Sequence, residues 1–516
     1  MRVVQTAVWS FHLDEAVSIP TGRRSESMLA SRFWLGIVGN LLPTAVLFVL
    51  LLFASRALGQ SAPVSPDQPW HASVERKIEA DAKNLRGSRF NVDPGKTYSL
   101  AELVNLAEAH NPETRLAWER ARSQAAALGV ARSELFPTLA AAVLSQTSRF
   151  DVLFGNEFFR QNIQDFEVAL DLNYTIFDFG ARSGRINAAR AQVLSANFAF
   201  NDTHRNVIFQ VDQAYYRLLS SMGQEEAARA SLANARAVEQ AAEDRLAHGL
   251  ATLPDVLEAR SATAQAEYDL QAVLGAEEIA RGDLATAVGV SATATIPVQP
   301  LNQVTTPDSI GDTVDQAIDR ALAKRPDLMQ QVAAVRSASA RVTEARAAYY
   351  PVLSVNANPG VQSLYGLQKP NPWSQRGDLA GGVRFSLQWT IFDGGARKNT
   401  LAQARANVHA AEAQGKVTSN QIADEVWAAY SNLNTAFRQR QAALALLQAA
   451  DQSYSAALES YNYGVRSLLD VTAAQRGLAQ ARSADVQART QVLTALRDLA
   501  FRTADSIQLN NRRTQP

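Results

Sequence analysis

Two stretches of the chain alternate strictly between apolar and polar residues, which is the pattern of a strand with one apolar and one polar face. They lie in residues 166–177 and 382–392, and each ends at a Phe-Asp pair. Each stretch is long enough to cross a bilayer, for which a tilted strand needs about 9–11 residues. A half-buried strand of a soluble sheet would alternate in the same way, so the pattern alone leaves both interpretations open.

A partner strand is expected before each of these stretches, at about 138–150 and 352–364, because turn residues separate the members of each pair. The second partner alternates clearly after Pro351, and the first does so less clearly. The chain then contains two β-hairpins, and four strands are too few to close a barrel. An open sheet edge is not viable in lipid, so strands that span a membrane here would need partner chains.

The remaining pattern is helical. Residues 180–247 and 395–462 contain no proline, are rich in good helix formers, and repeat apolar residues at sevenfold spacing. This spacing predicts left-handed supercoiling against neighbouring helices. Each segment would be roughly 100 Å long. Shorter helices are predicted at 99–110, 113–134, 252–288, 312–324, 327–348 and 467–504.

The same elements occur twice along the chain. Phe177-Asp178 returns as Phe392-Asp393, 215 residues further on, and Pro137 returns as Pro351, 214 residues further on. A register held over this span indicates two copies of one structural unit. The predicted domains are repeat 1 at 98–290, a proline-containing linker at 291–311 and repeat 2 at 312–505.

The N-terminal region has the pattern of a secretory signal. Residues 35–53 are largely apolar and precede the small residues that end at Gly59, which predicts cleavage near 59/60. A retained transmembrane anchor is the alternative. Residues 1–59 are therefore assigned to an upstream extension and signal peptide, and we hypothesise that Met28 is the true start. Residues 60–97 are expected to form an irregular arm and 506–516 a polar tail.

Each long helix is predicted to end at a glycine and to be followed at once by a new helix. Gly249 and Gly464 suit the left-handed conformation that closes a helix. The pairs Thr252 with Asp255, and Ser467 with Asp470, have the form of a capping box. Capping is a sufficient role for both acids. A second role stays open, because these turns are the points farthest from the strands.

Composition excludes several functions. Lys plus Arg equals Asp plus Glu at 50 each, so the net charge of zero gives no indication of nucleic-acid binding. The chain has no cysteine, and its six histidines are scattered without metal-ligand spacing. No nucleophile motif or acid–base pair stands out. We therefore expect no catalytic residue, no metal and no cofactor.

Together these features resemble the TolC-like outer-membrane efflux proteins. The resemblance covers about residues 98–505 and rests on four segments: the junctions 174–182 and 389–397 and the turns 249–256 and 461–471. It implies an α+β membrane protein that forms a homotrimer. Four strands from each chain would make one twelve-stranded β-barrel in outer-membrane lipid, and the helices would continue it as a periplasmic α-helical barrel.

The resemblance also implies a function. The trimer would be a passive exit duct for efflux or type I secretion, opened at its periplasmic tip by a periplasmic adaptor and an inner-membrane pump. The pump could be proton-driven or ATP-driven, and the chain itself would not be an enzyme. The alternative is a membrane-anchored periplasmic coiled-coil scaffold, with residues 35–53 as its anchor.

Candidate site residues follow from the same resemblance. Tyr461 and Asp255 would hydrogen-bond, Arg466 would reach the neighbourhood of Pro254, and Asp470 would form a ring of carboxylates in the pore. Adaptor docking would use the tip turns Gly249, Leu250, Ala251, Gly464, Val465 and Arg466. The barrel-to-tunnel junction would comprise Phe177, Asp178, Gly180, Phe392, Asp393 and Gly395.

Overall fold

A computed structural model describes residues 75–84, 92–93, 95–304, 313–368 and 374–505. The chain divides into two compact units, 1–88 and 89–516, and each is described by itself. In the first unit the structure describes one helix, α2 (Glu75–Asn84), inside the arm predicted to be irregular. That expectation is wrong for this stretch, because Glu, Lys and Ala favour helix in spite of the Pro and Ser around them.

The predicted signal peptide, its cleavage position, the Met28 start and the tail 506–516 lie outside the described residues.

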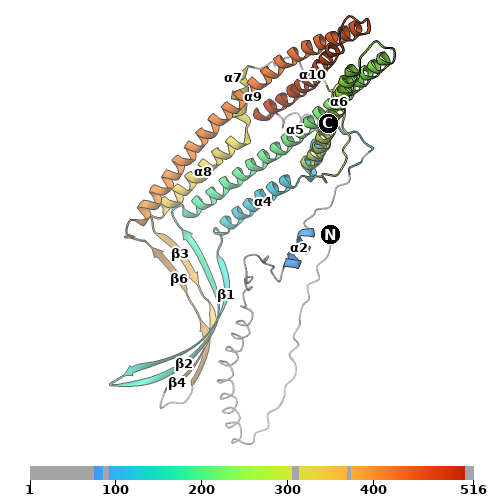
Figure 1. The fold of residues 1–516 in the computed structure, drawn as a ribbon. Coiled ribbons are helices and arrows are strands. Elements are labelled where there is room, and N and C mark those ends of the chain that lie inside the picture. Colours follow the sequence, from blue (N-terminus) through green and yellow to red (C-terminus); the bar gives the residue numbers. More distant parts are fainter. Residues whose placement is uncertain (1–74, 85–91, 94, 305–312, 369–373, 506–516) are drawn as a thin grey trace, which may run out of the picture. The chain divides into compact units, whose positions relative to one another are not determined.

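The second unit repeats one order of elements twice (Figure 1). The first copy comprises α3 (Leu100–His110), α4 (Pro112–Ser133), β1 (Thr138–Phe154), β2 (Glu157–Phe177), α5 (Ala181–Ala247) and α6 (Leu253–Val288). The second copy comprises α7 (Val314–Lys324), α8 (Pro326–Ala347), β3 (Val352–Ala357), β4 (Gly360–Gln368), β5 (Ser374–Ala380), β6 (Val383–Gln388), α9 (Ala396–Asn462) and α10 (Leu468–Arg502). A short 3₁₀ helix, η1 (Leu301–Gln303), lies between the copies.

The two longest helices, α5 and α9, contain 67 residues each, which corresponds to about 100 Å. Each begins within one residue of its predicted start. Several residues of the sevenfold series, including Ile186, Val207 and Ile422, are buried against neighbouring helices. The predicted supercoiled contacts therefore form along these faces.

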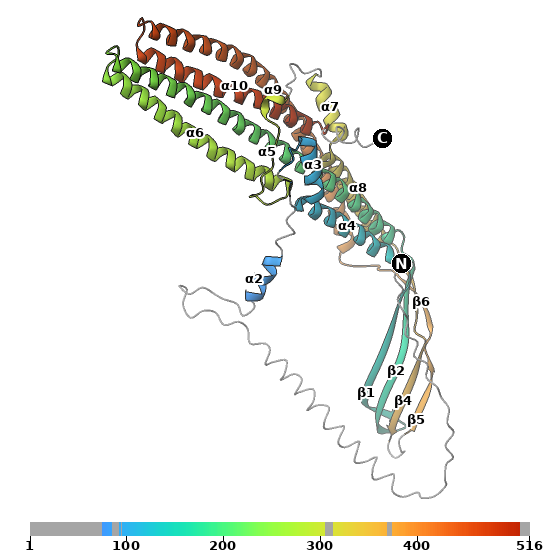
Figure 2. The same ribbon diagram turned by 90° about the vertical axis from the view of Figure 1, so that its right-hand side faces the viewer.

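The helices pack as antiparallel pairs. α6 folds back on α5 and α10 folds back on α9, and the two hairpins lie side by side through contacts of α5 with α10 (Figure 2). Nearer the strands, α4, α5, α8 and α9 contact one another in that order. The largest apolar cluster joins α3, α5 and α6 through Leu103, Leu218 and Leu284, among others. Among the described helices, none combines the length and the apolar character that a membrane span needs.

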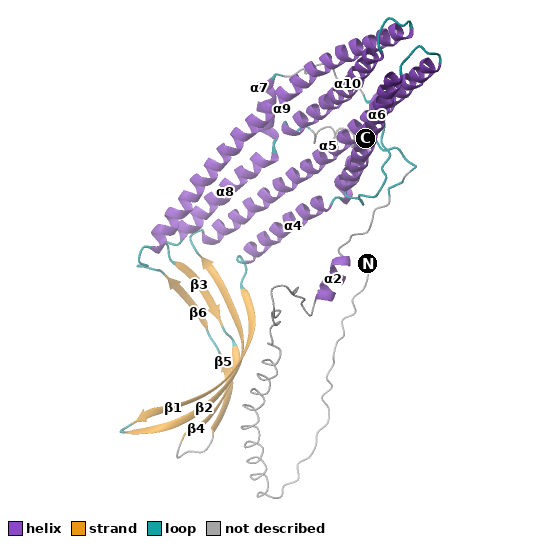
Figure 3. Ribbon diagram, in the orientation of Figure 1, coloured by secondary structure: helices purple, strands orange, loops and turns teal. Residues whose placement is uncertain are grey.

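The described strands form one antiparallel sheet, which lies next to the first residues of α5 and α9 (Figure 3). β2 pairs with β1 along one side and with both β3 and β4 along the other. β6 pairs with β3, and β5 pairs with β4. β3 with β4, and β5 with β6, therefore act as two interrupted strands. The sheet has four strand positions, as predicted, and its two edges are β1 and the β5–β6 strand.

The strand boundaries differ from the prediction. β1 and β2 are longer than expected, because a tight turn at Gly155 and Asn156 allows pairing as far as Phe154 with Glu157. In the second copy each strand is broken. Pro359 lacks the N–H that a central ladder needs, and Gly381 opposite it has a φ of 129°. The predicted strand end at 389–392 lies outside β6, and the last β6 residue paired with β3 is Gln388.

Candidate functional site

Two tight turns form the ends of the helical hairpins farthest from the sheet. Gly249 and Gly464 adopt φ values of 70° and 74°, in the left-handed region where a side chain is strained. The N–H of Leu250 donates to the carbonyl of Arg245 at 2.8 Å, and the N–H of Val465 donates to that of Ser460 at 2.9 Å. These bonds close each helix with the expected glycine motif. Leu250, Val465 and Arg466 are exposed on the turns, so they are available to a partner.

Both predicted acids of the tip lie in capping boxes. The Thr252 N–H and hydroxyl donate to Oδ2 of Asp255 at 2.8 and 2.7 Å. The Ser467 N–H and hydroxyl donate to Oδ2 of Asp470 at 3.2 and 2.9 Å. The Thr252 hydroxyl and N–H hold the pKa of Asp255 below its usual range. Capping leaves Asp470 exposed, so its charge still faces solvent.

Tyr461 does not hydrogen-bond to Asp255, in contrast to the expectation. The tyrosine is 5% exposed, and its hydroxyl has no hydrogen-bond partner. Burial raises the pKa of this hydroxyl. The carboxylate of Asp255 is occupied by Thr252 instead.

Arg245 is the residue that holds Tyr461. Its guanidinium lies 4.5 Å from the centre of the Tyr461 ring, and Nη1 donates to the carbonyl oxygens of Tyr461 and Asn462 at 2.8 and 3.3 Å. A cation at the carbonyl end of a helix also interacts favourably with the helix dipole. Arg245 therefore ties the end of α5 to the end of α9. The duplication could not indicate this contact, because the matching position in the second copy is Ser460.

Arg466 makes no polar side-chain contact near Pro254 in the part of the chain that the structure describes. It lies exposed on the second turn and makes no hydrogen bond or ion pair through its side chain within the described residues. Cationic links between the hairpins come from Arg245 on α5 and from Arg476 on α10, whose Nη2 donates to Glu258 on α6 at 2.9 Å.

An apolar cluster supports the tip beneath these polar contacts. The cluster contains Val238 and Ala242 of α5, Val256 of α6, Tyr461 of α9 and Val471 of α10. Because all four helices contribute, movement of one hairpin relative to the other would disturb this cluster.

The strand-to-helix junctions have the same geometry in both copies. In the first, Asp178 accepts hydrogen bonds from the N–H of Gly180 at 3.3 Å and from the N–H and Nε of Arg182 at 2.8 and 3.1 Å. Arg182 also donates to the carbonyl of Ile176, the penultimate residue of β2, at 3.2 Å. The aspartate therefore caps the helix while the arginine fixes the strand to it.

In the second junction, Asp393 accepts from the N–H of Gly395 at 3.1 Å and from the N–H and Nε of Arg397 at 3.0 and 2.7 Å. Arg397 donates to the carbonyl of Ile391 at 3.1 Å. The two arginines were not proposed as site residues, although they recur within the duplicated motif. Their repetition at the shared offset was the signal that could have identified them.

Aromatic residues surround the first junction. Phe179 has a φ of 50°, and its ring stacks on Tyr350 at 4.9 Å and meets Phe177 edge-on at 4.6 Å. The second junction has Gly394 at the position of Phe179, and its Phe392 is 86% exposed. The first junction therefore carries a phenylalanine–tyrosine cluster, whereas at the second Arg397 lies 5.4 Å from the ring centre of Tyr349.

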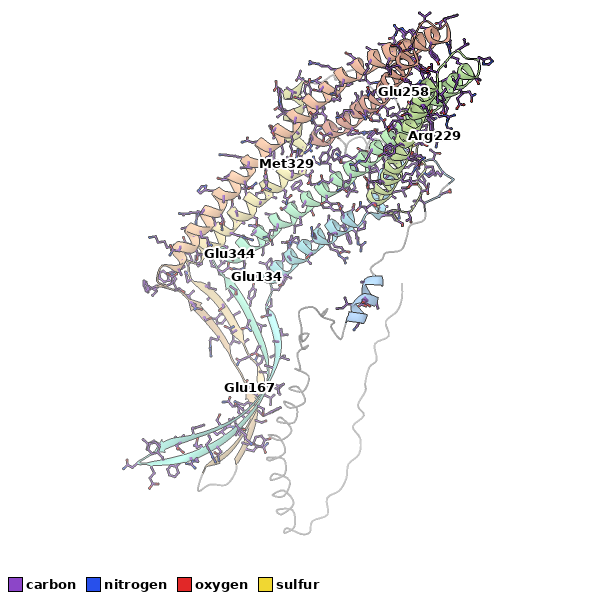
Figure 4. All side chains as sticks on the ribbon, viewed as in Figure 1. Glu134, Glu167, Arg229, Glu258, Met329 and Glu344 are labelled. Carbon is purple, nitrogen blue, oxygen red and sulfur yellow. The ribbon has the colours of Figure 1, made fainter. Side chains whose placement is uncertain are left out.

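A salt-bridge cluster joins three helices next to the first junction. Arg185 on α5 contacts Glu134 at 2.6 Å and Glu344 on α8 at 3.5 Å. Figure 4 labels both acids near the strand-proximal ends of α4 and α8. In the described part of the chain, no group of three or more His, Cys, Asp or Glu side chains is placed to hold a metal ion.

Comparison with known proteins agrees with this geometry. The family model described as "Outer membrane efflux protein" matches residues 103–290 and 317–504, one match for each copy. The chain belongs to the outer membrane efflux protein family. This is a family of channel proteins, and membership places the chain in the outer membrane with its helices extending into the periplasm.

Individual relatives have low sequence identity to this chain but match most of its length. Protein CyaE of Bordetella pertussis is 28% identical over 409 residues, which cover 77% of this chain and 83% of that protein. Outer membrane protein OprJ of Pseudomonas aeruginosa is 26% identical over 470 residues, covering 88% and 94%.

Solved structures share the fold. A membrane protein from Pseudomonas aeruginosa superposes with a TM-score of 0.70 at 24% identity, covering 81% of this chain and 97% of that one. The outer-membrane channel OprN gives a TM-score of 0.69 at 20% identity, covering 81% and 96%. At these identities the likeness establishes the fold alone.

Proposed function

We propose that three copies of this chain form a passive exit duct through the outer membrane, used for efflux or type I secretion. The observation that carries the proposal is the sheet, which has four strand positions and two unpaired edges. Such a sheet cannot lie in lipid alone, since each exposed backbone group would cost several kcal/mol. Joining the edges of three identical sheets gives a closed twelve-stranded barrel.

The strands also carry the exposed apolar side chains that a lipid-facing surface needs. Leu139, Val143, Phe158, Phe385 and Leu387 are all more than half exposed in the single chain. Because cross-strand pairing places all five on one face of the sheet, that face of the barrel would contact lipid and the other would line a wet channel.

Energy and cargo selection would come from partners. The family is made of channel proteins, so we propose that the chain is not an enzyme. It would work with a periplasmic adaptor and an inner-membrane pump, either proton-driven or ATP-driven. The toluene efflux pump outer membrane protein TtgC of Pseudomonas putida, 23% identical over 445 residues, belongs to a pump by its name. The adaptor would dock on the exposed tip turns at Leu250, Ala251 and Val465.

The tip is the proposed gate. Asp470 would contribute one carboxylate per copy to a ring, while Arg245 and Tyr461 would restrain the two hairpins. Asp255 and Arg466 flank this contact, and both could change partners when the hairpins move. The support for this proposal is that Arg245 joins the ends of the two long helices at the tip, where an apolar cluster from all four helices would be disturbed by movement of one hairpin.

Two measurements test the duct. The purified full chain should be a trimer in detergent by multi-angle light scattering, and it should conduct ions when reconstituted in planar bilayers. A monomer, or a trimer that gives no current even after adaptor addition, would overturn the proposal.

A further inference from the structure

The internal duplication indicates which strand residues pair where neighbouring copies meet. β1 is one edge of the sheet, and the β5–β6 strand is the other. In a closed ring, β1 of each copy must pair with the β5–β6 strand of the next. The structure contains no second copy, but it contains an internal pairing of the same type, between β2 of the first repeat and β3 of the second.

Within the chain, the sequence offsets preserve the strand register. In the first hairpin, Thr138 lies opposite Asn173. Adding 214 to the first strand and 215 to the second gives Val352 opposite Gln388, and this is the pairing found between β3 and β6. The offsets therefore carry strand register from one repeat to the other without error.

The same offsets predict which residues pair at the seam, which is the contact between the β5–β6 strand of one copy and β1 of the next. Tyr174 lies opposite Val355 and Thr175 opposite Ser354; after a bulge, Phe177 lies opposite Leu353. Adding 215 to the β2 residues and subtracting 214 from the β3 residues converts these pairs. We propose that Trp389, Thr390 and Phe392 of one copy lie opposite Ala141, Ala140 and Leu139 of the next copy.

This pairing explains two features of the single chain. Residues 389–392 alternate like a strand but are not part of β6, because β3 pairs only as far as Gln388. Ile391 and Phe392 are 82% and 86% exposed at this position. Both features are expected of a strand end whose partner belongs to another molecule.

The helices next to the seam show the same lack of a neighbour. α5 and α8 pack together in the chain, and Ser337 on α8 donates to the carbonyl of Ala188 on α5 at 3.3 Å. The corresponding helices at the seam are α9 and α4 of the next copy. α8 buries five of its residues, whereas α4, which has the same length, buries none. Ser123 occupies the position of Ser337 and is exposed.

The helical part of the seam should be wider than its internal counterpart. Gly184 lets α5 approach α8 so closely that a Cβ there would lie 2.7 Å from the backbone nitrogen of Glu344. The matching residue on α9 is Asn399, and the residue that matches Glu344 is Val130. The strands therefore fix the register, and the helices adjust around it.

This inference rests on the proposed trimer, and cysteine cross-linking separates the two. The chain has no native cysteine, so the background is zero. Directly opposed residues of antiparallel strands have Cα atoms about 4.5–5.5 Å apart, which a disulfide can bridge. The double variant Thr390→Cys with Ala140→Cys should give covalent trimers on non-reducing denaturing gels after oxidation in membranes.

The control is Thr390→Cys with Ala141→Cys, in which the second cysteine points to the opposite face of the sheet. This control should give at least tenfold less covalent product than the Thr390→Cys with Ala140→Cys variant. Efficient cross-linking of the control, or no cross-linking of either variant in a trimer that is intact by light scattering, would overturn the register alone. Monomeric protein with all cysteines reduced would overturn both the register and the proposed duct.

Discussion

At the residue scale, Arg245 joins the ends of the two longest helices at the tip. It donates two hydrogen bonds to the end of α9 and covers the ring of Tyr461. Arg245→Met keeps the length of the side chain but removes these contacts, which are worth about 2 kcal/mol together. We expect the variant to raise the mean single-channel conductance in planar bilayers, because the hairpins separate more easily.

Arg236→Met is the matched control for this prediction. Arg236 lies on the same helix and forms an exposed ion pair with Glu267 at 2.7 Å, a type of contact worth less than about 1 kcal/mol. Its conductance should equal that of the unmodified chain. Equal conductance for Arg245→Met would mean that the arginine only stabilises the fold.

The charge of Asp470 can be separated from its capping role. Asp470→Asn keeps an acceptor for the Ser467 N–H but removes the negative charge. If three such carboxylates narrow the pore, the variant should show weaker block by divalent cations, by roughly tenfold in the blocking concentration. Asp315→Asn, at an exposed position on α7, provides the control. Unchanged block in Asp470→Asn would leave the residue with its capping role alone.

Asp212 should make the helical core sensitive to pH. Burial on α5 raises its pKa from the ordinary 3.8 to about 6, and Arg497 opposes this only in part. The folded state therefore holds a proton that the unfolded state releases between pH 4 and 6. Stability should fall as pH rises through this window and level off above it, by about 3 kcal/mol in total.

The measurement is the melting temperature of the detergent-solubilised protein between pH 4.5 and 7.5. Asp212→Asn should flatten this dependence, since the amide does not titrate. Asp283→Asn, which alters an exposed ion pair with Arg217, should leave it in place. A dependence that persists in Asp212→Asn would assign the effect to another group.

At the scale of elements, helices were more predictable than strands. The ends of α5 and α9 follow from local signals: a junction glycine at the start, a capping glycine at the end and no proline between them. The breaks at Pro359 and Gly381 depend on which residues lie opposite each other in the sheet. That information is not local, so the alternation pattern alone predicted continuous strands.

The contacts of the tip were less predictable for a related reason. The capping boxes of Asp255 and Asp470 depend on residues three positions apart, and both are present. The partner of Tyr461 comes from a helix more than 200 residues earlier in the chain. Because Arg245 has no equivalent in the second repeat, duplication could not indicate it either.

The exposed face of α4 gives a prediction at this scale. Ala131 matches Ala345, which is buried on α8, whereas Ala125 matches Ser339, which is exposed there. Ala131→Trp should lower the temperature at which the trimer dissociates on denaturing gels, by at least 5 °C, because the indole would clash with α9 of the next copy. Ala125→Trp should have no effect. Equal effects of both substitutions would exclude α4 as a seam helix.

At the scale of the whole molecule, the duplication makes the proposed trimer a ring of six repeats, of which each chain supplies two. The contact between repeats inside the chain and the contact between chains are then versions of one interface. Such an interface joins two different surfaces, β1 with the β5–β6 strand, and it must close after a fixed number of copies. An isologous dimer would instead join each edge to itself.

Co-expression of two single-cysteine chains distinguishes these arrangements. A chain with Thr390→Cys can cross-link only to a neighbour with Ala140→Cys, and each carries one thiol. Mixed trimers should therefore give covalent dimers and no covalent trimers, while either chain expressed alone should stay uncross-linked. An isologous interface would join β1 to β1 of the other copy, so Thr390→Cys would have no Ala140→Cys opposite it and the mixture would give no covalent dimers. Absence of covalent dimers in mixed trimers that are intact by light scattering would therefore show that the copies do not close into a ring through this seam.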